Sequence, residues 1–240
     1  MNNDILLILI ACATSALTAV TGIGGGMMLI AIMPGFLPPA AIVPVHALVQ
    51  LFSNASRALF GWRFLRWEFT LAFVTGSIIG GSIAASVTRE INLEYTPLFI
   101  AAYILFVVWG PPLKFNKPPP GEFVLIGAIQ TGLSLLVGAT GPMSQAALMA
   151  RNLKRDALVV SAALMTSFTH LTKVALFALL GFSFASYWQL ILGMSIAVTL
   201  GALLGTRIRY KVPEATFRKI LKWALTLLAL RMVYLTLAQV

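Results

Sequence analysis

The stretch Thr21-Gly22-Ile23-Gly24-Gly25-Gly26 lies inside a long apolar run, and four of its six residues are glycine. Glycine costs about 1 kcal/mol per residue in a helix interior, so a membrane helix that enters this stretch is expected to break there. Within a bilayer, only protein, water or a ligand can satisfy the amides and carbonyls that a broken helix leaves. The stretch therefore predicts a binding site.

The composition is that of an integral membrane protein. Of the 240 residues, 59% are hydrophobic and 10% are charged, whereas soluble domains carry roughly 25% charged residues. The apolar runs are about 20 residues long, which is typical of transmembrane helices and not of a membrane β-barrel. The net charge of +10 comes from Lys and Arg in short connections, so it indicates orientation in the membrane and not nucleic-acid binding. We predict an all-α polytopic membrane protein.

The chain is predicted to form about eight spans in two halves. A proline-rich linker at 111–122 separates a first half, residues 1–110, from a second half, residues 123–240. Glycine stretches interrupt the first and the fifth span. The spans cover about 5–33, 40–60, 69–87, 96–109, 123–150, 157–180, 187–206 and 216–237.

The two halves resemble each other when the sequence is shifted by 116 positions (138 − 22 = 116). An internal repeat of four spans per half explains this, and such repeats are typical of transporters with a site near mid-membrane. Four spans per half would make the two copies point the same way. If the glycine-broken segments are re-entrant hairpins instead, the span count and the relation between the halves both change. The shift aligns Gly22 with Gly138, Gly25 with Gly141, Asn54 with His170, and Arg57 with Lys173.

The aligned cations indicate what the site binds. Lys173 lies inside an apolar run, where a lysine costs about 2.5–3.5 kcal/mol and usually has a function. Arg57 lies nearer the end of its span, and its alignment with Lys173 favours a functional role. Asn54 shares a helix face with Arg57, as His170 does with Lys173, because each pair is three residues apart. All seven acidic residues lie outside the span interiors, so a small anion is the expected partner of these cations.

The glycine stretches fit an anion, because a helix that restarts there presents free amides and the positive end of its dipole. The alternative is that these glycines only allow close helix packing. His46 has no polar counterpart and is expected to bond a neighbouring backbone group. For His170, hydrogen bonding to the ligand ranks above proton coupling, and sodium coupling also stays open. The predicted site comprises Gly22, Gly24, Gly25, Gly26, Asn54, Arg57, Gly138, Thr140, Gly141, His170 and Lys173.

The first glycine stretch, its degenerate second copy at Gly138-Ala139-Thr140-Gly141-Pro142, and the basic position in each half together resemble the sulfite exporter TauE/SafE family. The second copy departs from the family pattern where Ala139, Thr140 and Pro142 replace glycine. The resemblance covers nearly the whole chain. It implies a permease for sulfite, sulfonates or related organosulfur anions in the cytoplasmic membrane of a prokaryote.

The expected function is a secondary permease that exports such an anion, with a passive anion channel as the alternative. A scaffold without a ligand is disfavoured, because it would not need buried cations. An intramembrane enzyme is disfavoured, because the span interiors hold no carboxylate pair and no G-x-S-x-G motif. Neither a metal site nor a cofactor is predicted.

The basic residues in the connections predict the orientation. The connections after spans three, five and seven are expected to be cytoplasmic, which places both termini outside. The turn with Arg63 and Arg66 opposes this assignment, as do Lys114 and Lys117 in the linker. The basic residues of the three connections are Arg89, Arg151, Lys154, Arg155, Arg207, Arg209, Lys211, Arg218 and Lys219.

Overall fold

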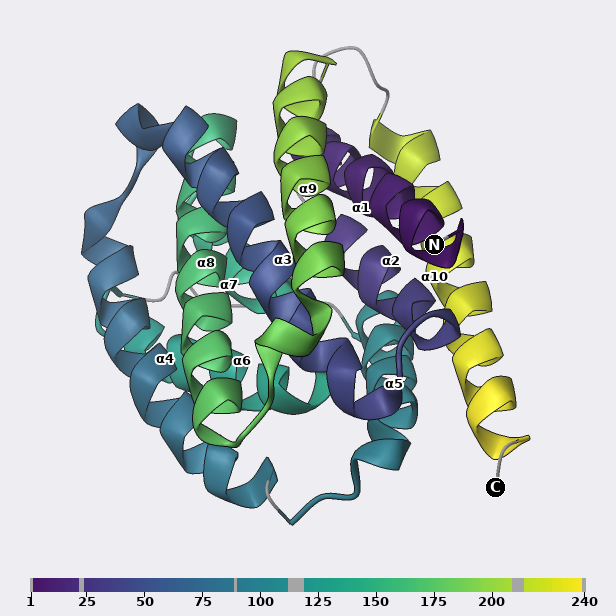
Figure 1. Cartoon of the computed structure of the whole chain (residues 1–240). Helices are drawn as coiled ribbons and strands as arrows, with labels where there is room; N and C mark the ends of the chain where they lie inside the picture. The colour runs from purple at the N-terminus through teal and green to yellow at the C-terminus, as the bar shows by residue number, and fades with distance from the viewer. Residues whose placement is uncertain (1, 22–23, 89, 112–118, 209–213, 239–240) are drawn as a thin grey trace.

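The computed structural model describes residues 2–21, 24–88, 90–111, 119–208 and 214–238, and every regular element in these ranges is a helix (Figure 1). Short 3₁₀ helices lie at Met33–Gly35, Trp62–Phe64, Leu93–Tyr95 and Phe184–Tyr187. The α-helices are α1 (Asn2–Thr21), α2 (Gly25–Ile32), α3 (Pro39–Phe60), α4 (Trp67–Thr88), α5 (Thr96–Trp109), α6 (Glu122–Val137), α7 (Pro142–Met149), α8 (Arg155–Leu179), α9 (Trp188–Ile208) and α10 (Glu214–Leu237).

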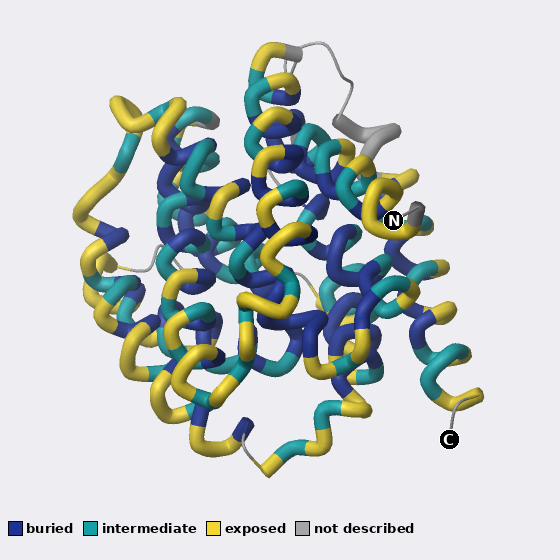
Figure 2. The backbone as a smooth tube through the Cα atoms, viewed as in Figure 1, coloured by how far each residue is buried: buried dark blue, intermediate teal, exposed yellow. Residues whose placement is uncertain are grey.

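The helix boundaries follow the predicted apolar runs closely, and the helical fold class is confirmed. Many of the exposed residues have large apolar side chains. The buried stretches of the backbone face the inside of the molecule, between the helices (Figure 2). This is the pattern expected of helices in lipid. Among the described residues, five segments are long and apolar enough to cross a membrane: Asn3–Val20, Trp67–Thr88, Asp156–Leu179, Phe184–Arg207 and Lys219–Leu237.

The chain reverses direction at both glycine stretches. Gly24 has a φ of 96° and Gly138 a φ of 75°, values that residues with a side chain rarely adopt. Gly25 lies against the backbone of Thr14 and the side chain of Thr18, so α2 begins beside α1 and does not continue it. In the same way, the Thr140 hydroxyl donates to the backbone carbonyl of Gln130 in the middle of α6 (2.9 Å).

The two helices that follow the reversals are too short to span a membrane. α2 and α7 have 8 residues each. A helix of this length measures about 12 Å, whereas the hydrocarbon core is about 30 Å thick. The glycine stretches therefore resemble the re-entrant hairpins that the sequence left open, and not interruptions within a straight span.

The first helix of each half packs along the fourth helix of the other half. α1 and α9 run in the same direction, and so do α4 and α6, with glycines that let the backbones approach closely. The residues in contact are Ile8 with Gly193, Cys12 with Gly201 and Ala16 with Gly205 in the first pair, and Val124 with Gly76 and Ala128 with Gly80 in the second.

The third helices of the two halves, α3 and α8, lie against each other in the centre of the molecule (Figure 1). They run in opposite directions, because His46 lies beside His170 near one end of the contact and Gly61 lies beside Val160 near the other. α8 runs in the same direction as α4, since Ser161 bonds Arg66 and Thr172 bonds Ser77. The polar residues predicted for the site lie around this central crossing.

Candidate functional site

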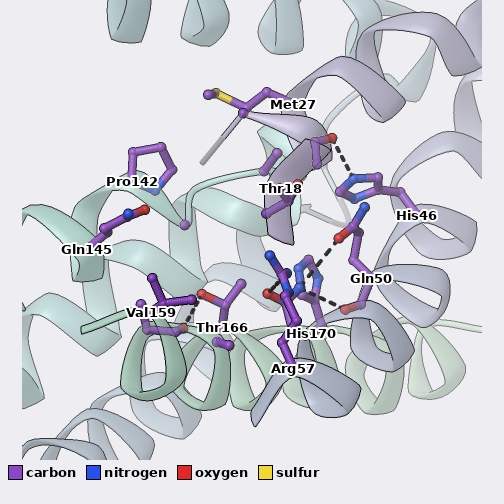
Figure 3. A pocket seen from close by; sticks show the side chains of 17 residues that line it. Thr18, Met27, His46, Gln50, Arg57, Pro142, Gln145, Val159, Thr166 and His170 are labelled. Carbon is purple, nitrogen blue, oxygen red and sulfur yellow. Dashed lines mark hydrogen bonds between the residues drawn. The ribbon is translucent and has the colours of Figure 1, made fainter. Parts of the chain in front are cut away.

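A small cavity lies where the two reversals meet α3 and α8 (Figure 3). Its volume is about 70 Å³. Residues of both halves line it, from α1, α2 and α3 on one side and from α7 and α8 on the other. The polar side chains of the lining are Thr18, His46, Gln50, Asn54, Arg57, Gln145, Thr166 and His170.

Arg57 supplies the positive charge of the cavity and is only 7% exposed. Its Nε donates to the Ser53 carbonyl (3.2 Å) and its Nη2 to the Asn54 Oδ1 (2.6 Å). The Asn54 amide in turn donates to the Gln50 carbonyl (2.8 Å), which fixes the orientation of its oxygen. These bonds use two of the five N–H groups of the guanidinium. Among the described residues no carboxylate pairs with it, so the remaining donors are available to an anion.

Lys173 is fully buried and lies outside the cavity lining. Its Nζ donates to the carbonyl oxygens of Gly138 (2.7 Å) and Ser134 (3.4 Å). These carbonyls end α6, where the helix dipole is negative and a cation is stabilising. Lys173 therefore neutralises the C-terminal end of a helix. Arg57, with which it aligns in sequence, lines the cavity instead.

The first reversal presents backbone donors to the cavity. Gly24, Gly26 and Met27 belong to the lining. α2 begins at Gly25, and the first amides of a helix have no acceptor within it. Since Gly24 and Gly26 carry no side chain, an anion in the cavity can approach these amides closely.

The second reversal has fewer donors to offer. α7 begins at Pro142, which has no N–H group. The next amides are occupied, because Met143 donates to the Thr140 carbonyl (3.1 Å) and Ser144 donates to the Gln130 Oε1 (2.8 Å). The side chain of Gln130 thus fills the role that a ligand was expected to take at Gly141.

Two histidines meet at the cavity, with ring centroids 5.8 Å apart. His46 Nε2 lies 2.9 Å from the Gly26 carbonyl oxygen, which confirms the expectation that His46 bonds a backbone group. Figure 3 shows this bond beside Gln50 and above His170. His46 also lines the cavity, which the sequence did not predict.

Part of the predicted site lies around the cavity. Six predicted residues line the cavity: Gly24, Gly26, Asn54, Arg57, Gly141 and His170. Gly25, Gly138, Thr140 and Lys173 lie behind the lining, where they hold the reversals in place. Gly22 falls outside the described residues.

Sequence reasoning missed Gln50, Gln145 and Thr166. Gln50 lies one turn before Asn54 and two turns before Arg57, on the same helix face, so the spacing of the three residues contains the signal. Thr166 precedes His170 by one turn on α8 in the same way. Gln145 follows Gly141 by one turn, and only the reversal of the chain brings it to the cavity.

The profile of the family described as sulfite exporter TauE/SafE matches residues 7–232. No curated protein and no solved structure matches the chain. The family match covers both reversals, the central crossing and all the residues of the cavity, in a chain whose helices are those of an integral membrane protein. The chain therefore belongs to the sulfite exporter TauE/SafE family.

Proposed function

We propose that the protein is a secondary permease that exports sulfite, or a similarly small organosulfur anion, across the cytoplasmic membrane of a prokaryote. The observation that carries this proposal is the cavity between the two reversals, where no carboxylate in the described part of the chain pairs with Arg57. A buried cation without a partner is strongly unfavourable. An oxyanion would supply the missing charge and would accept bonds from a planar guanidinium.

The anion is expected to lie between Arg57 and the start of α2. The amides of Gly26 and Met27, which line the cavity, and the positive end of the α2 dipole would face it from one side. The guanidinium of Arg57 would face it from the other side, and Gln50 and His170 would complete its hydrogen bonds. Asn54 would hold the guanidinium in place.

The size of the cavity favours a small anion over an aromatic sulfonate. At about 70 Å³, it is less than half the size of the roughly 150 Å³ cavity that holds benzene. Sulfite has four heavy atoms and fits this volume better than an aryl sulfonate does. We therefore expect selection for sulfite and one-carbon sulfonates.

The helix directions support an inverted repeat as the basis of transport. Each half would consist of one re-entrant hairpin and three further helices, so the second copy would point the opposite way from the first. The first helix of each half packs against the fourth helix of the other half, α1 against α9 and α6 against α4. A two-fold axis between the halves would produce these two matching pairs. A site at the interface of inverted repeats can open to either side by movement of one half against the other.

The same helix directions support both termini outside the cell. Because α4 and α8 run in the same direction, their first residues lie on one side of the membrane, with Arg63 and Arg66 before α4 and Arg151 and Lys154 before α8. Arg207 at the end of α9 joins them, since the chain turns at 180–187 and α9 runs opposite to α8 (Figure 1). The cytoplasmic side is expected to carry these basic residues, so the turn with Arg63 and Arg66 now supports the orientation. The connection after α4, which the sequence assigned to the cytoplasm, would instead lie outside.

A flux assay tests the proposal. Proteoliposomes loaded with labelled sulfite should release it in a protein-dependent manner, and benzenesulfonate should neither be released nor compete. Accumulation of sulfite against its own gradient, driven by an imposed ion gradient at clamped membrane potential, separates a permease from a passive channel. Sulfite release no faster than that from empty liposomes would refute the function.

A fusion experiment tests the orientation. Alkaline phosphatase, which is active only outside the cytoplasm, is joined after Val240, and a fluorescent protein joined there serves as the opposite reporter. We expect an active phosphatase. Fluorescence without phosphatase activity would reverse the assignment and leave the transport proposal standing.

A further inference from the structure

His46 is bonded to the first reversal and lies beside the second. Its Nε2 is bonded to the Gly26 carbonyl at the first reversal. A carbonyl oxygen only accepts hydrogen bonds, so Nε2 must carry the hydrogen. In a neutral imidazole the other nitrogen, Nδ1, is then a lone-pair acceptor. The backbone contact thus fixes the tautomer of His46.

The Nδ1 atom of His46 is buried and has no hydrogen-bond partner among the described residues. It faces the second reversal, where a Cβ added to Gly138 would lie 3.8 Å from it. Buried polar atoms without a partner are uncommon and call for an explanation. An unpaired imidazole lone pair is a proton-binding position.

The groups around His46 decide when a proton is stable there. On α8, His170 faces its ring, and Lys173 holds the carbonyl of the same Gly138 that Nδ1 faces. On α3, Arg57 lines the same cavity. α2 and α6 contribute backbone groups only, at Gly26 and Gly138. Every nearby charge is positive, so an added proton is repelled in the empty site and is compensated once an anion is present.

We propose that His46 takes up one proton at Nδ1 when the anion binds, so that the protein carries sulfite and a proton together. This rests on the proposed function. Sulfite as a dianion brings two negative charges into the cavity, and Arg57 is the one Lys or Arg among the described residues that line it. Protonated His46 balances the second charge, while Lys173 stays bonded to the carbonyl at the end of α6 and lies outside the lining. A cavity whose charges cancel is the least costly one to keep inside a membrane. Because the two ligands stabilise each other, each raises the affinity for the other by the same factor.

The proton comes from water on the side where the anion enters and leaves with the anion on the other side. One net negative charge then crosses with each sulfite. A cytoplasm-negative membrane potential still favours export of this charge. No bond other than the transferred N–H forms or breaks.

The test compares wild type with His46→Gln. The glutamine amide can replace the Nε2 donor to Gly26, but it has no basic nitrogen. Sulfite and proton movements are measured in proteoliposomes with a labelled anion and a luminal pH dye, at clamped potential and at a pH where sulfite is mostly a dianion. Wild type should move one proton more per sulfite than the variant. The acid–base equilibrium of sulfite is the same for both proteins, so it cancels in the difference.

His170→Gln serves as the matched control. It should bind sulfite less tightly and keep the wild-type proton count. If His46→Gln does not fold, infrared difference spectra of wild type with ¹⁵N-labelled histidine replace the comparison, and imidazolium bands should appear when sulfite is added. Equal proton counts in wild type and His46→Gln, or no imidazolium signal, would leave His46 as a structural imidazole only and overturn the inference. Absence of any sulfite movement by wild type would instead refute the proposed function.

Discussion

The two glycine reversals align in sequence but meet the cavity in different ways. The first exposes the start of α2 through Gly24, Gly26 and Met27. The second begins α7 with Pro142 and has its next amides bonded within the protein. The aligned cations differ accordingly, because Arg57 faces the cavity and Lys173 caps the end of α6. Positions that the predicted repeat aligns therefore have different partners in the structure.

The largest difference is expected in the yield of folded protein when a methyl group is added at Gly25 or at Gly141, its aligned counterpart. A methyl group at Gly25 would collide with the backbone of Thr14, whereas one at Gly141 would lie at an ordinary 3.6 Å from Thr166 Oγ1. Gly25→Ala should therefore yield little folded protein, and Gly141→Ala should fold. Size-exclusion profiles of the two purified variants check this. Equal yields would show that the reversals pack alike.

The next largest effect is expected for Arg57→Met, which leaves the anion without its cation. Loss of one partner of a buried charge pair costs about 3–5 kcal/mol, so sulfite should bind at least about 100-fold more weakly. The Tm of the anion-free protein should stay within a few degrees of wild type. Binding is measured by calorimetry in detergent, with Arg63→Met as a control on the exposed surface. An unchanged affinity would remove Arg57 from the site.

A methyl group at Gly26 tests the donors of the first reversal. It would lie 3.5 Å from the Gln50 side chain, which the fold can tolerate. It would also occupy space that the anion needs. One extra carbon in a pocket costs about 1–3 kcal/mol, so Gly26→Ala should weaken sulfite binding by about 10-fold or more. Gly141→Ala is the matched variant in the second reversal and should have a smaller effect; the opposite order would assign the anion to α7.

The smallest effect on affinity is expected for Lys173→Met. This variant removes the donor to Gly138 and Ser134, and unsatisfied buried carbonyls cost about 1–3 kcal/mol each. The Tm should fall clearly, while sulfite affinity should change by much less than it does in Arg57→Met. Thermal unfolding and calorimetry on the same samples separate the two quantities. A loss of affinity as large as that of Arg57→Met, at unchanged Tm, would return Lys173 to the anion site.

The helices, both breaks and the central position of the aligned polar residues could be predicted from the sequence. Apolar run lengths, prolines and glycines act locally, so the boundaries of α3, α4 and α8 follow from them. The place of Arg57 and Asn54 at the cavity could be predicted, because all seven acidic residues lie outside the predicted span interiors and because the two residues share a helix face.

The direction of the chain after each break could not be predicted, because it depends on the contact of Gly25 with Thr14 and of Thr140 with Gln130. The position of Lys173 could not be predicted for the same reason. Its partner is a carbonyl that becomes available only when α6 ends at Gly138. Gln130, which occupies the second reversal, gives no signal in the sequence, since a glutamine within an apolar helix has no fixed partner.

The packing of α1 along α9 also sets the order of assembly. The Ser15 hydroxyl donates to the Val198 carbonyl at 2.6 Å, across 183 residues of chain. During synthesis, α1 reaches the membrane long before α9 exists, so the face of α1 that will contact the glycines of α9 must wait in lipid or against another protein. The two halves therefore cannot mature one after the other as independent units, and each completes the fold of the other only when α9 has been inserted.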